Sequence, residues 1–342
     1  MAHPDFINAT GYLNTASIGL PPGSALKAMQ TAVGEWARGD ATAPGYDQYV
    51  ARAREAWSAM VGADPAQVSI GPQVSYFAGL VAQSLPAGAR VLSYDGDFAS
   101  LVYPFLARGD LEVRLVPLQE VAGEIRPDTD VVAVSAVQSS DGRVADLDAI
   151  AQAAGDAGAL TVIDATQAAG WLPLDARYFD FLIAGAYKWL LSPRGTAFMA
   201  LRPGLLETVR PLTPGWYSAD RPWDRVYGAP LRLAEDARRL DLSPAWLDWV
   251  GTVAALEYLA ARDVRDIQAH DVGLANALRA GLGMEPSDSA IVSIERDGAA
   301  EALGAAGLRA GGLTGAARVC FHLYNDEDDV DAVLQALSAR RP

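Results

Sequence analysis

The sequence predicts an α/β fold: a mostly parallel sheet covered on both faces by helices, followed by a smaller α+β unit. Two observations carry this prediction. Short apolar strands alternate with amphipathic helices from about residue 67 to residue 202. Beyond residue 202 the alternation stops, and a segment rich in proline, glycine and aromatic residues leads into a long helix. With 342 residues, 51% of them hydrophobic, the chain has the length of about two domains and can bury a large core.

The first part of the chain supplies the alternating elements in order. Helices are predicted where apolar residues recur with a period near 3.6, over residues 24–39, 49–62, 74–85, 100–109 and 146–158. The last of these begins with acidic residues and ends at Gly158, which suits the polarity of a helix. Strands are predicted over residues 68–70, 89–96, 112–118, 130–137, 160–166, 179–187 and 195–201.

The second part changes character. Residues 211–233 are loop-like and aromatic, and a helix is predicted over residues 243–263, with Ser243 as its cap and Pro244 in its first turn. A small α+β unit follows, containing strands over residues 289–295 and 318–325 and a terminal helix. We therefore divide the chain into an N-terminal arm that also starts the small domain (1–30), a large domain (31–245) and a C-terminal small α+β domain (246–342).

Charge and composition exclude several classes of function. The net charge is −15, from 27 basic and 42 acidic residues, which argues against a nucleic-acid surface or attraction to anionic lipid. The single cysteine, Cys320, cannot form an intrachain disulfide. The N-terminus does not read as a signal peptide, and no apolar run reaches about 20 residues. We expect a cytoplasmic protein without membrane or nucleic-acid partners and without a metal site.

Three polar features follow predicted strands, where ligands bind in open α/β sheets. Asp164 ends the apolar run "LTVI", and Lys188 follows the next strand inside the aromatic stretch "AYKWLL". Gln73 and Val74 lie where a strand turns into a helix, whose free N–H groups suit a phosphate. Each feature alone has a simpler explanation: a capping aspartate, a snorkelling lysine and an ordinary helix start.

Taken together, these features match the needs of pyridoxal 5′-phosphate (PLP). That cofactor requires an amine for a Schiff base, an acid for its pyridine nitrogen and a seat for its phosphate. An amine in a largely apolar pocket has a lowered pKa, which makes it a better nucleophile. The sequence therefore predicts a PLP site at the carboxyl edge of the sheet.

The chain also resembles the class V aminotransferase family of PLP enzymes, which includes cysteine desulfurases, isopenicillin-N-epimerase-like proteins and kynureninases. The motifs that carry the resemblance are "YLNTASIGLPP", "DATQAAGWLPLD", "AYKWLLSPRGTAF", "RRLDLSPAW" and "RVCFHLYNDEDDVD". They extend from Tyr12 to Asp331, so the resemblance covers nearly the whole chain. It implies fold type I of the PLP-dependent enzymes, with a seven-stranded type of sheet in the large domain.

The resemblance implies a role for each matching residue. Lys188 would form the internal aldimine and move protons at the substrate Cα, and Asp164 would pair with the pyridinium nitrogen. Arg318 would clamp the substrate carboxylate, and Asn14 would approach the substrate. The remaining cofactor contacts would be the phenolic oxygen (Gln167), the ring face (Phe98), the phosphate (Gln73, Val74, Tyr187 and, from a partner subunit, Ser243) and a further contact (Gln138, Ser139).

The chain departs from parts of the family pattern. Cysteine desulfurases use a mobile loop cysteine, whereas Cys320 lies inside a predicted strand, and they carry histidine where this chain has Tyr187. Kynureninases have tyrosine there but use histidine at the position of Gln167. The resemblance implies a homodimeric enzyme of the aminotransferase type acting on an amino acid or a derivative. Epimerisation, C–S cleavage by β-elimination and non-catalytic binding remain alternatives.

Overall fold

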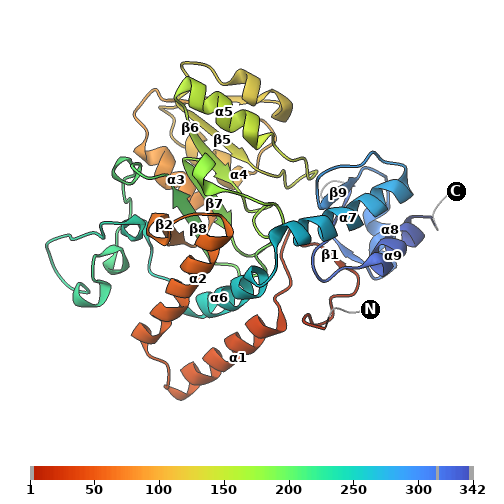
Figure 1. Ribbon diagram of the computed structural model, residues 1–342, viewed down its shortest axis with the longest axis horizontal. Helices are drawn as coiled ribbons and strands as arrows, with labels where there is room; N and C mark the ends of the chain where they lie inside the picture. Colours follow the sequence, from red (N-terminus) through yellow and green to blue (C-terminus); the bar gives the residue numbers. More distant parts are fainter. Residues whose placement is uncertain (1–3, 313–315, 339–342) are drawn as a thin grey trace.

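The computed structural model describes residues 4–312 and 316–338 (Figure 1). Its centre is a seven-stranded sheet in the order β2-β8-β7-β6-β5-β3-β4. The strands are β2 (Val68–Gly71), β3 (Arg90–Tyr94), β4 (Glu112–Val116), β5 (Val131–Ser135), β6 (Leu160–Asp164), β7 (Phe181–Gly185) and β8 (Ala197–Leu201). β8 is antiparallel to both β2 and β7, and the other pairs are parallel. The predicted α/β class with a mostly parallel sheet is confirmed.

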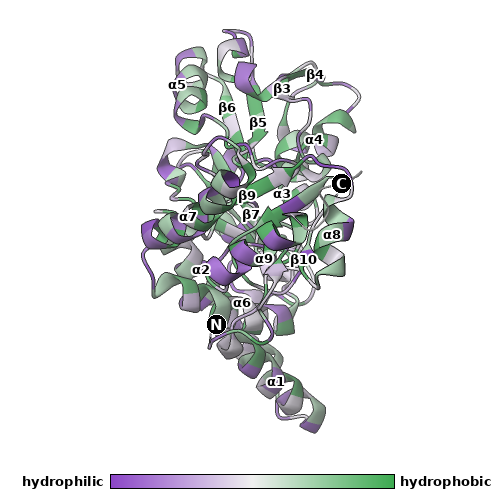
Figure 2. Ribbon diagram, turned by 90° about the vertical axis from the view of Figure 1, so that its right-hand side faces the viewer, coloured by the Kyte–Doolittle hydropathy of each residue, from purple (hydrophilic) through white to green (hydrophobic). Residues whose placement is uncertain are grey.

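Helices cover both faces of the sheet. They are α2 (Asp47–Met60), α3 (Val74–Ser84), α4 (Ala99–Leu106) and α5 (Leu147–Ala157), and α1 (Gly23–Arg38) precedes α2 in the chain. Alternate residues of β5 face opposite sides: Val132 and Val134 pack in the core that contains α2 and α5, and Val131 packs in the core that contains α3 and α4. In Figure 2 the apolar colour accordingly lies on the strands between the helices.

The C-terminal part forms a smaller α+β unit, drawn in blue in Figure 1. α6 (Trp246–Ala260) leads into this unit, whose elements are α7 (Val264–Leu282), β9 (Ile291–Ile294), α8 (Ala299–Ala305), β10 (Arg309–Ala310), β11 (Ala317–Cys320) and α9 (Glu327–Ser338). β11 pairs antiparallel with β9. The N-terminal arm joins this unit, because β1 (Tyr12–Leu13) pairs in parallel with β10, a pairing that the sequence did not predict.

The helix expected over residues 243–263 is shorter than predicted. Ala245, not Ser243, is its N-cap residue, and the chain before it is not helical. It ends at Ala260, and Asp263 then starts α7 by accepting a hydrogen bond from the Arg265 N–H at 2.9 Å. The strand expected over residues 318–325 is also shorter. It ends at Cys320, and the His322 N–H donates to the Asn325 side chain instead of continuing the ladder.

Between β8 and α6 the chain forms short 3₁₀ turns, among them Leu206–Thr208, Trp216–Ser218, Pro222–Asp224 and Ala237–Leu240. This agrees with the loop-like composition of residues 211–233. The domain boundary at residue 245 stays a prediction, and α6 packs against α1 and α2 of the large domain. None of the helices in the described ranges is long and apolar enough to cross a membrane.

Candidate active site

Lys188 lies in a tight loop between β7 and β8. The N–H of Ala186 donates to the carbonyl of Thr196 at 2.9 Å, and the N–H of Ser192 returns to the carbonyl of Ala186 at 3.1 Å. From the N-terminal arm, the Gly19 N–H donates to the Tyr187 carbonyl at 2.9 Å. Leu191 adopts φ 55°, a left-handed conformation that is unfavourable for leucine. The surrounding hydrogen bonds therefore hold the lysine on a strained backbone.

The side chain of Lys188 is buried, with 5% of its surface exposed, so it is not a snorkelling surface lysine. Its Nζ lies 5.2 Å from the centre of the Phe98 ring and 5.6 Å from that of Tyr187. Burial lowers the pKa of Lys188 to about 8, and the charge of Arg318 acts in the same direction, whereas Asp164 opposes both. A substantial fraction of this amine is therefore neutral near pH 8.

Asp164 ends β6, the strand next to β7, and lines the same pocket as Lys188. The ends of these two neighbouring strands therefore bring Asp164 and Lys188 to the same place. The carboxylate accepts a hydrogen bond from the Thr166 N–H at 2.9 Å, so it also caps the following turn. Burial raises the pKa of Asp164 to about 6, the nearby Asp97 carboxylate adds to this, and Lys188 opposes it. A positive charge supplied by a ligand would stabilise the ionised form.

The start of α3 forms one wall of the pocket. Gln73, the N-cap residue, and Val74, the first helical residue, both line it. No side chain caps this helix, so its first N–H groups are free for an anionic ligand. Phe98, which precedes α4, is 42% exposed and faces the Lys188 amine. An exposed aromatic ring beside a buried amine suits stacking against a planar ligand.

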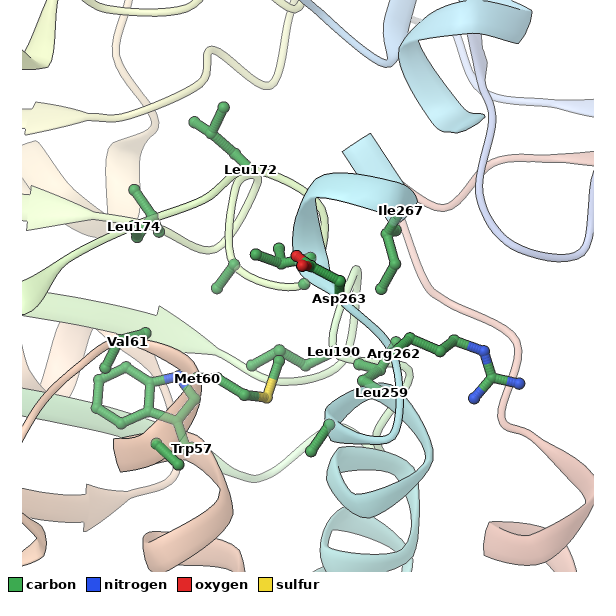
Figure 3. Close-up of a pocket in the computed structure, with 15 residues that line it drawn as sticks. Trp57, Met60, Val61, Leu172, Leu174, Leu190, Leu259, Arg262, Asp263 and Ile267 are labelled. Atoms are coloured by element: carbon green, nitrogen blue, oxygen red, sulfur yellow. The ribbon is translucent and has the colours of Figure 1, made fainter. Parts of the chain in front are cut away.

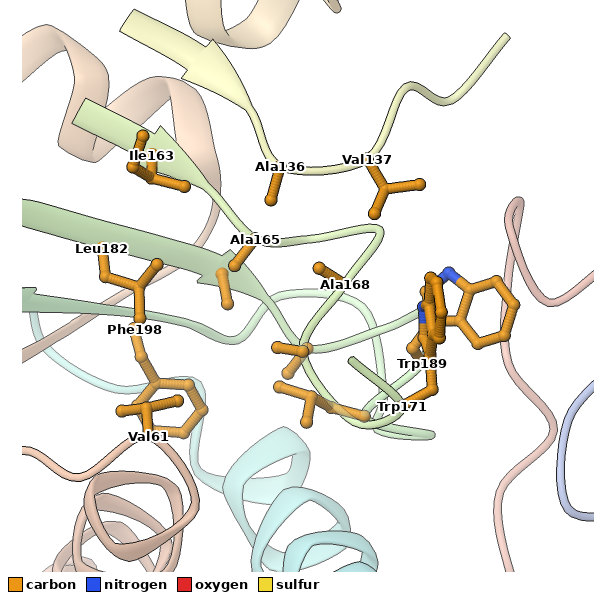
Figure 4. Close-up of a cluster of buried hydrophobic side chains, with 14 of the residues drawn as sticks. Val61, Ala136, Val137, Ile163, Ala165, Ala168, Trp171, Leu182, Trp189 and Phe198 are labelled. Carbon is orange, nitrogen blue, oxygen red and sulfur yellow. The ribbon is translucent and has the colours of Figure 1, made fainter. Parts of the chain in front are cut away.

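Gln167 is buried and fully oriented by three partners. Its Nε2 donates to the carbonyl of Ala16 at 2.9 Å, and its Oε1 accepts from the Trp189 indole at 2.8 Å. Its own carbonyl accepts from the Trp171 indole at 2.7 Å. Figure 4 shows the two tryptophans close together beside the lysine loop. The second hydrogen on Nε2 is left for a ligand in the pocket.

Arg318, on β11, reaches the large domain. Its guanidinium donates to the Ser139 carbonyl and, at 2.8 Å, to the Ser17 hydroxyl, rather than pairing with Asp326 or Glu327 on the surface. Among the described residues, two buried polar atoms near this position have no hydrogen-bond partner: Nε of Arg318 and Oδ1 of Asn14. Unpaired buried groups of this kind are costly unless a ligand satisfies them.

The other predicted residues fall into two groups. Ser139 and Tyr187 line the pocket, and Gln138 lies buried beside it, where its side chain bonds Ser135 and Asp97. Ser243 is exposed and does not line the pocket. Its contact with the cofactor of a partner subunit stays a prediction.

Sequence reasoning missed several residues of the pocket. Pro72, Ser100, Ser135, Thr166 and Arg194 line it as well. Arg194 is the most informative, because its guanidinium lies 5.2 Å from the centre of the Tyr187 ring. Its position in the Pro-Arg-Gly turn shortly after Lys188 is the sequence feature from which Arg194 could have been predicted as a pocket residue.

A second pocket lies away from these residues, between α2, the Ala169–Leu174 segment and the junction of α6 with α7 (Figure 3). Its walls are mainly apolar, including Trp57, Met60 and Leu259. None of the residues that the sequence predicted for the site lines this second pocket.

Comparisons with known proteins agree with this geometry. The family model described as Aminotransferase class-V matches residues 102–299. The chain is 32% identical to the uncharacterized aminotransferase YcbU of Bacillus subtilis, over 64% of this chain and 60% of that protein. It is 27% identical to isopenicillin N epimerase of Streptomyces clavuligerus, over 69% and 65% of the two chains. The matches thus span less than two thirds of these relatives.

The fold has a solved counterpart. The structure of the cystine C-S lyase C-DES superimposes with a TM-score of 0.87, covering 98% of this chain and 99% of that one, at 21% sequence identity. A variant of the same lyase has been solved with glycine covalently linked to its PLP cofactor. At this level of identity the likeness establishes the fold, and the residues of the pocket must carry the chemistry.

Proposed function

We propose a function from one premise: this chain belongs to the class V aminotransferase family, and its cofactor is PLP. The proposal is that it transforms an amino acid or an amino-acid-derived substrate, with aminotransfer as the first candidate reaction. The observation that carries it is the buried amine of Lys188 beside the buried carboxylate of Asp164, next to an uncapped helix start.

The residues fit the cofactor. When bound, PLP supplies an electrophilic aldehyde carbon and a ring that withdraws electrons from the substrate. Lys188 would hold the aldehyde carbon, and its lowered pKa leaves enough neutral amine to attack near pH 8. Released from that carbon, the same amine would take and return the proton at the substrate Cα. Its burial excludes water from the place where that proton moves.

Asp164 would keep a proton on the pyridine nitrogen, and the resulting charge pair would offset the burial of its carboxylate. Gln167 would donate its remaining Nε2 hydrogen to the phenolic oxygen, and Phe98 would stack on the ring. Gln73, Val74 and Tyr187 would hold the phosphate at the start of α3, and the position of Arg194 on the Tyr187 ring suits the same anion.

Arg318 would bind the substrate carboxylate, with Asn14 beside it. The unpartnered Nε of Arg318 supports this assignment, since a carboxylate would accept from the guanidinium. The unpartnered Oδ1 of Asn14 is an acceptor and would instead need a donor group of the substrate. The Ser17 and Ser139 contacts orient the guanidinium before substrate arrives. This set of residues serves several reactions, so epimerisation and C–S cleavage by β-elimination are retained as alternatives, as is binding without turnover.

One mechanism is disfavoured by a specific observation. Cys320 is fully buried, and burial raises the pKa of its thiol. A thiol of this kind cannot move out to accept sulfur from a substrate. Sulfur transfer through a cysteine persulfide on this chain is therefore not proposed, whereas direct elimination needs no such cysteine.

We further propose a cytoplasmic homodimer with the active site near the interface. Apolar and aromatic side chains are exposed on the α1 and 211–233 segments, among them Val33, Trp36, Trp223, Tyr227 and Leu231. Trp36 borders a largely apolar groove that also includes Trp246, close in sequence to Ser243. Burying these side chains against a second copy would bring Ser243 into an interface. Sedimentation of the PLP-bound protein tests this, and a fully loaded monomer would contradict it.

The test of the main proposal uses the colour of the protein. Purified protein supplied with PLP should absorb in the visible range, and borohydride should bleach it and fix the cofactor to Lys188. Lys27 and Lys188 are the only lysines in the sequence, so peptide mapping identifies the modified lysine without ambiguity. Lys188→Ala should lose the reducible band. Protein that never takes up PLP, or a band that persists in this variant, would contradict the proposal.

The reaction is then read from a panel of amino acids. Incubation with each one, followed by optical spectra and product analysis, separates the alternatives. A keto acid formed without release of ammonia indicates aminotransfer, and an inverted Cα indicates epimerisation. Release of a thiol or sulfide together with a keto acid and ammonia indicates β-elimination. A loaded protein that changes none of the panel would favour binding without turnover.

A further inference from the structure

A histidine and an aspartate form a fully buried pair behind the lysine loop. His322 follows β11 and Asp271 lies on α7, and neither side chain is exposed to solvent. His322 Nδ1 lies 2.9 Å from Asp271 Oδ2, and His322 Nε2 lies 3.1 Å from the carbonyl oxygen of Trp189. Trp189 is the residue after Lys188, so the pair ends on the backbone that carries the amine.

The partners determine where the protons are. A carbonyl oxygen can only accept, so His322 Nε2 must carry a hydrogen and donate it to Trp189. The contact between Nδ1 and Asp271 then holds one more proton, on either the imidazole or the carboxyl group. In both arrangements Nε2 remains a donor and the pair has no net charge. This neutrality is compatible with complete burial, where an isolated charge would be very costly.

The backbone of Gly170 also lies close to the Trp189 carbonyl. Gly170 has φ 112°, and a Cβ atom placed there would lie 2.4 Å from the Trp189 oxygen. Leu191, two residues after Trp189, adopts the left-handed conformation described above. A strained loop keeps its shape only when its neighbours fix it. The hydrogen bond from His322 is a contact from the small domain that helps to fix the lysine loop in this way.

The segment that ends at His322 also carries the proposed carboxylate clamp, on β11 just before it. Arg318, Cys320 and His322 lie at every second position along the chain, and the charge of Arg318 acts on the Lys188 amine. Arg318 and His322 are therefore two contacts of one segment with the active site. One reaches Ser139 and Ser17, and the other reaches the lysine loop.

We propose that His322 and Asp271 are positioning residues, which fix the backbone of the lysine loop relative to Arg318 through the hydrogen bond to the Trp189 carbonyl. Their role in catalysis rests on the proposed function of Lys188, but their effect on the loop does not. A defect in this pair should loosen residues 186–195 in the cofactor-free protein and misplace the amine in the loaded protein.

The test compares two variants. His322→Phe combined with Asp271→Leu removes the donor to Trp189 without leaving a buried carboxylate unpaired. Asp271→Asn is the conservative variant, because its amide can donate to Nδ1 and keep Nε2 as the donor. We expect the double variant to increase hydrogen exchange of residues 186–195 and to weaken PLP binding by about 10- to 100-fold, since small misplacements have effects of that size. The single variant Asp271→Asn should keep both the hydrogen exchange of residues 186–195 and the affinity for PLP near the wild-type values.

Val333→Ala is the matched control, because it weakens the small-domain core at a buried position of α9 away from the loop. It should lower stability without a selective effect on residues 186–195 or on PLP binding. The proposal is overturned if the double variant exchanges residues 186–195 at the wild-type rate, or if Val333→Ala reproduces its effects at equal loss of stability. A wild-type protein that fails to bind PLP would overturn the proposed function instead, and the exchange measurement would still decide the inference.

Discussion

Two buried aspartates, Asp241 and Asp164, lie in different regions of the large domain and have different partners. Asp241 is 1% exposed and accepts hydrogen bonds from the Arg54 guanidinium at 2.6 Å, the Ile70 N–H at 2.8 Å and the Ser69 hydroxyl at 3.0 Å. Asp164 is 3% exposed and accepts from Thr166 at the edge of a pocket. Burial raises the pKa of both carboxyl groups.

The difference separates a structural carboxylate from one suited to a ligand. The charge of Asp241 is neutralised by a guanidinium that belongs to the fold, so this region is complete as it stands. Asp164 opposes an amine whose own pKa is lowered, and no ion pair shorter than 4 Å joins the two in the described part of the chain. The region around Asp164 therefore lacks a compensating cation of its own and suits a ligand that brings one, as the proposed function requires.

The largest effect should come from breaking the complete pair. Arg54→Met leaves the Asp241 carboxylate buried without its cation, and should lower the free energy of unfolding by about 3–5 kcal/mol. Arg52→Met, on the same helix, is the control. Its partner is Glu257 and both side chains are nearly half exposed, so its loss should cost about 1 kcal/mol or less. Urea unfolding measures both, and equal effects of the two substitutions would contradict the comparison.

Removing the other carboxylate should have the opposite effect on stability. The folded-state pKa of Asp164 is about 6 and its unfolded value is 3.8, so ionisation costs stability as the pH rises through this interval. Cofactor-free Asp164→Asn should be more stable than wild type by about 2–3 kcal/mol at pH 7. The gain should vanish below about pH 4, where the carboxyl group is protonated in both states. A stability loss at pH 7, measured by urea unfolding, would show that Asp164 is structural like Asp241.

The lysine of the same region should reveal its lowered pKa in the rate of cofactor uptake. Only the neutral amine attacks, so the uptake rate should rise about tenfold per pH unit below pH 8 and level off above it. Stopped-flow absorbance measures this rate. Because Asp164 raises the pKa of Lys188, Asp164→Asn should shift the midpoint to lower pH. A rate that keeps rising to pH 10 would mean that the amine is not desolvated.

The smallest effect concerns Arg194, which is exposed beside Tyr187. Arg194→Gln should weaken PLP binding about tenfold and leave binding of pyridoxal, which lacks the phosphate, unchanged. Arg210→Gln removes the same charge from an exposed position outside the pocket and should change neither dissociation constant. Equal losses for PLP and pyridoxal in Arg194→Gln would show that Arg194 does not contact the phosphate.

Local patterns in the sequence predicted those helices and strands that depend on residues close together in the chain. The alternation of strands and helices identified the sheet, and the ends of its strands located Lys188 and Asp164. Other features depend on residues far apart in the chain. The pairing of β1 with β10 and the contact of His322 with Asp271 arise only when the N-terminal arm and the small domain meet the sheet. The spacing of apolar residues along the chain does not predict such long-range contacts. Arg194 was not predicted as a site residue because the Pro-Arg-Gly sequence was interpreted only as a turn.

The placement of β2 at the edge of the sheet has a consequence for biosynthesis. Its four residues are all buried, and its one neighbour in the sheet, β8, is completed only when the ribosome reaches Leu201. The Asp241 carboxylate that accepts from Ile70 is made later still. At ~5–20 residues per second the strand waits several seconds with its backbone unpaired. We therefore expect the nascent chain to need protection from aggregation at this strand, and the proposed phosphate seat that follows it at Gln73 to form late in synthesis.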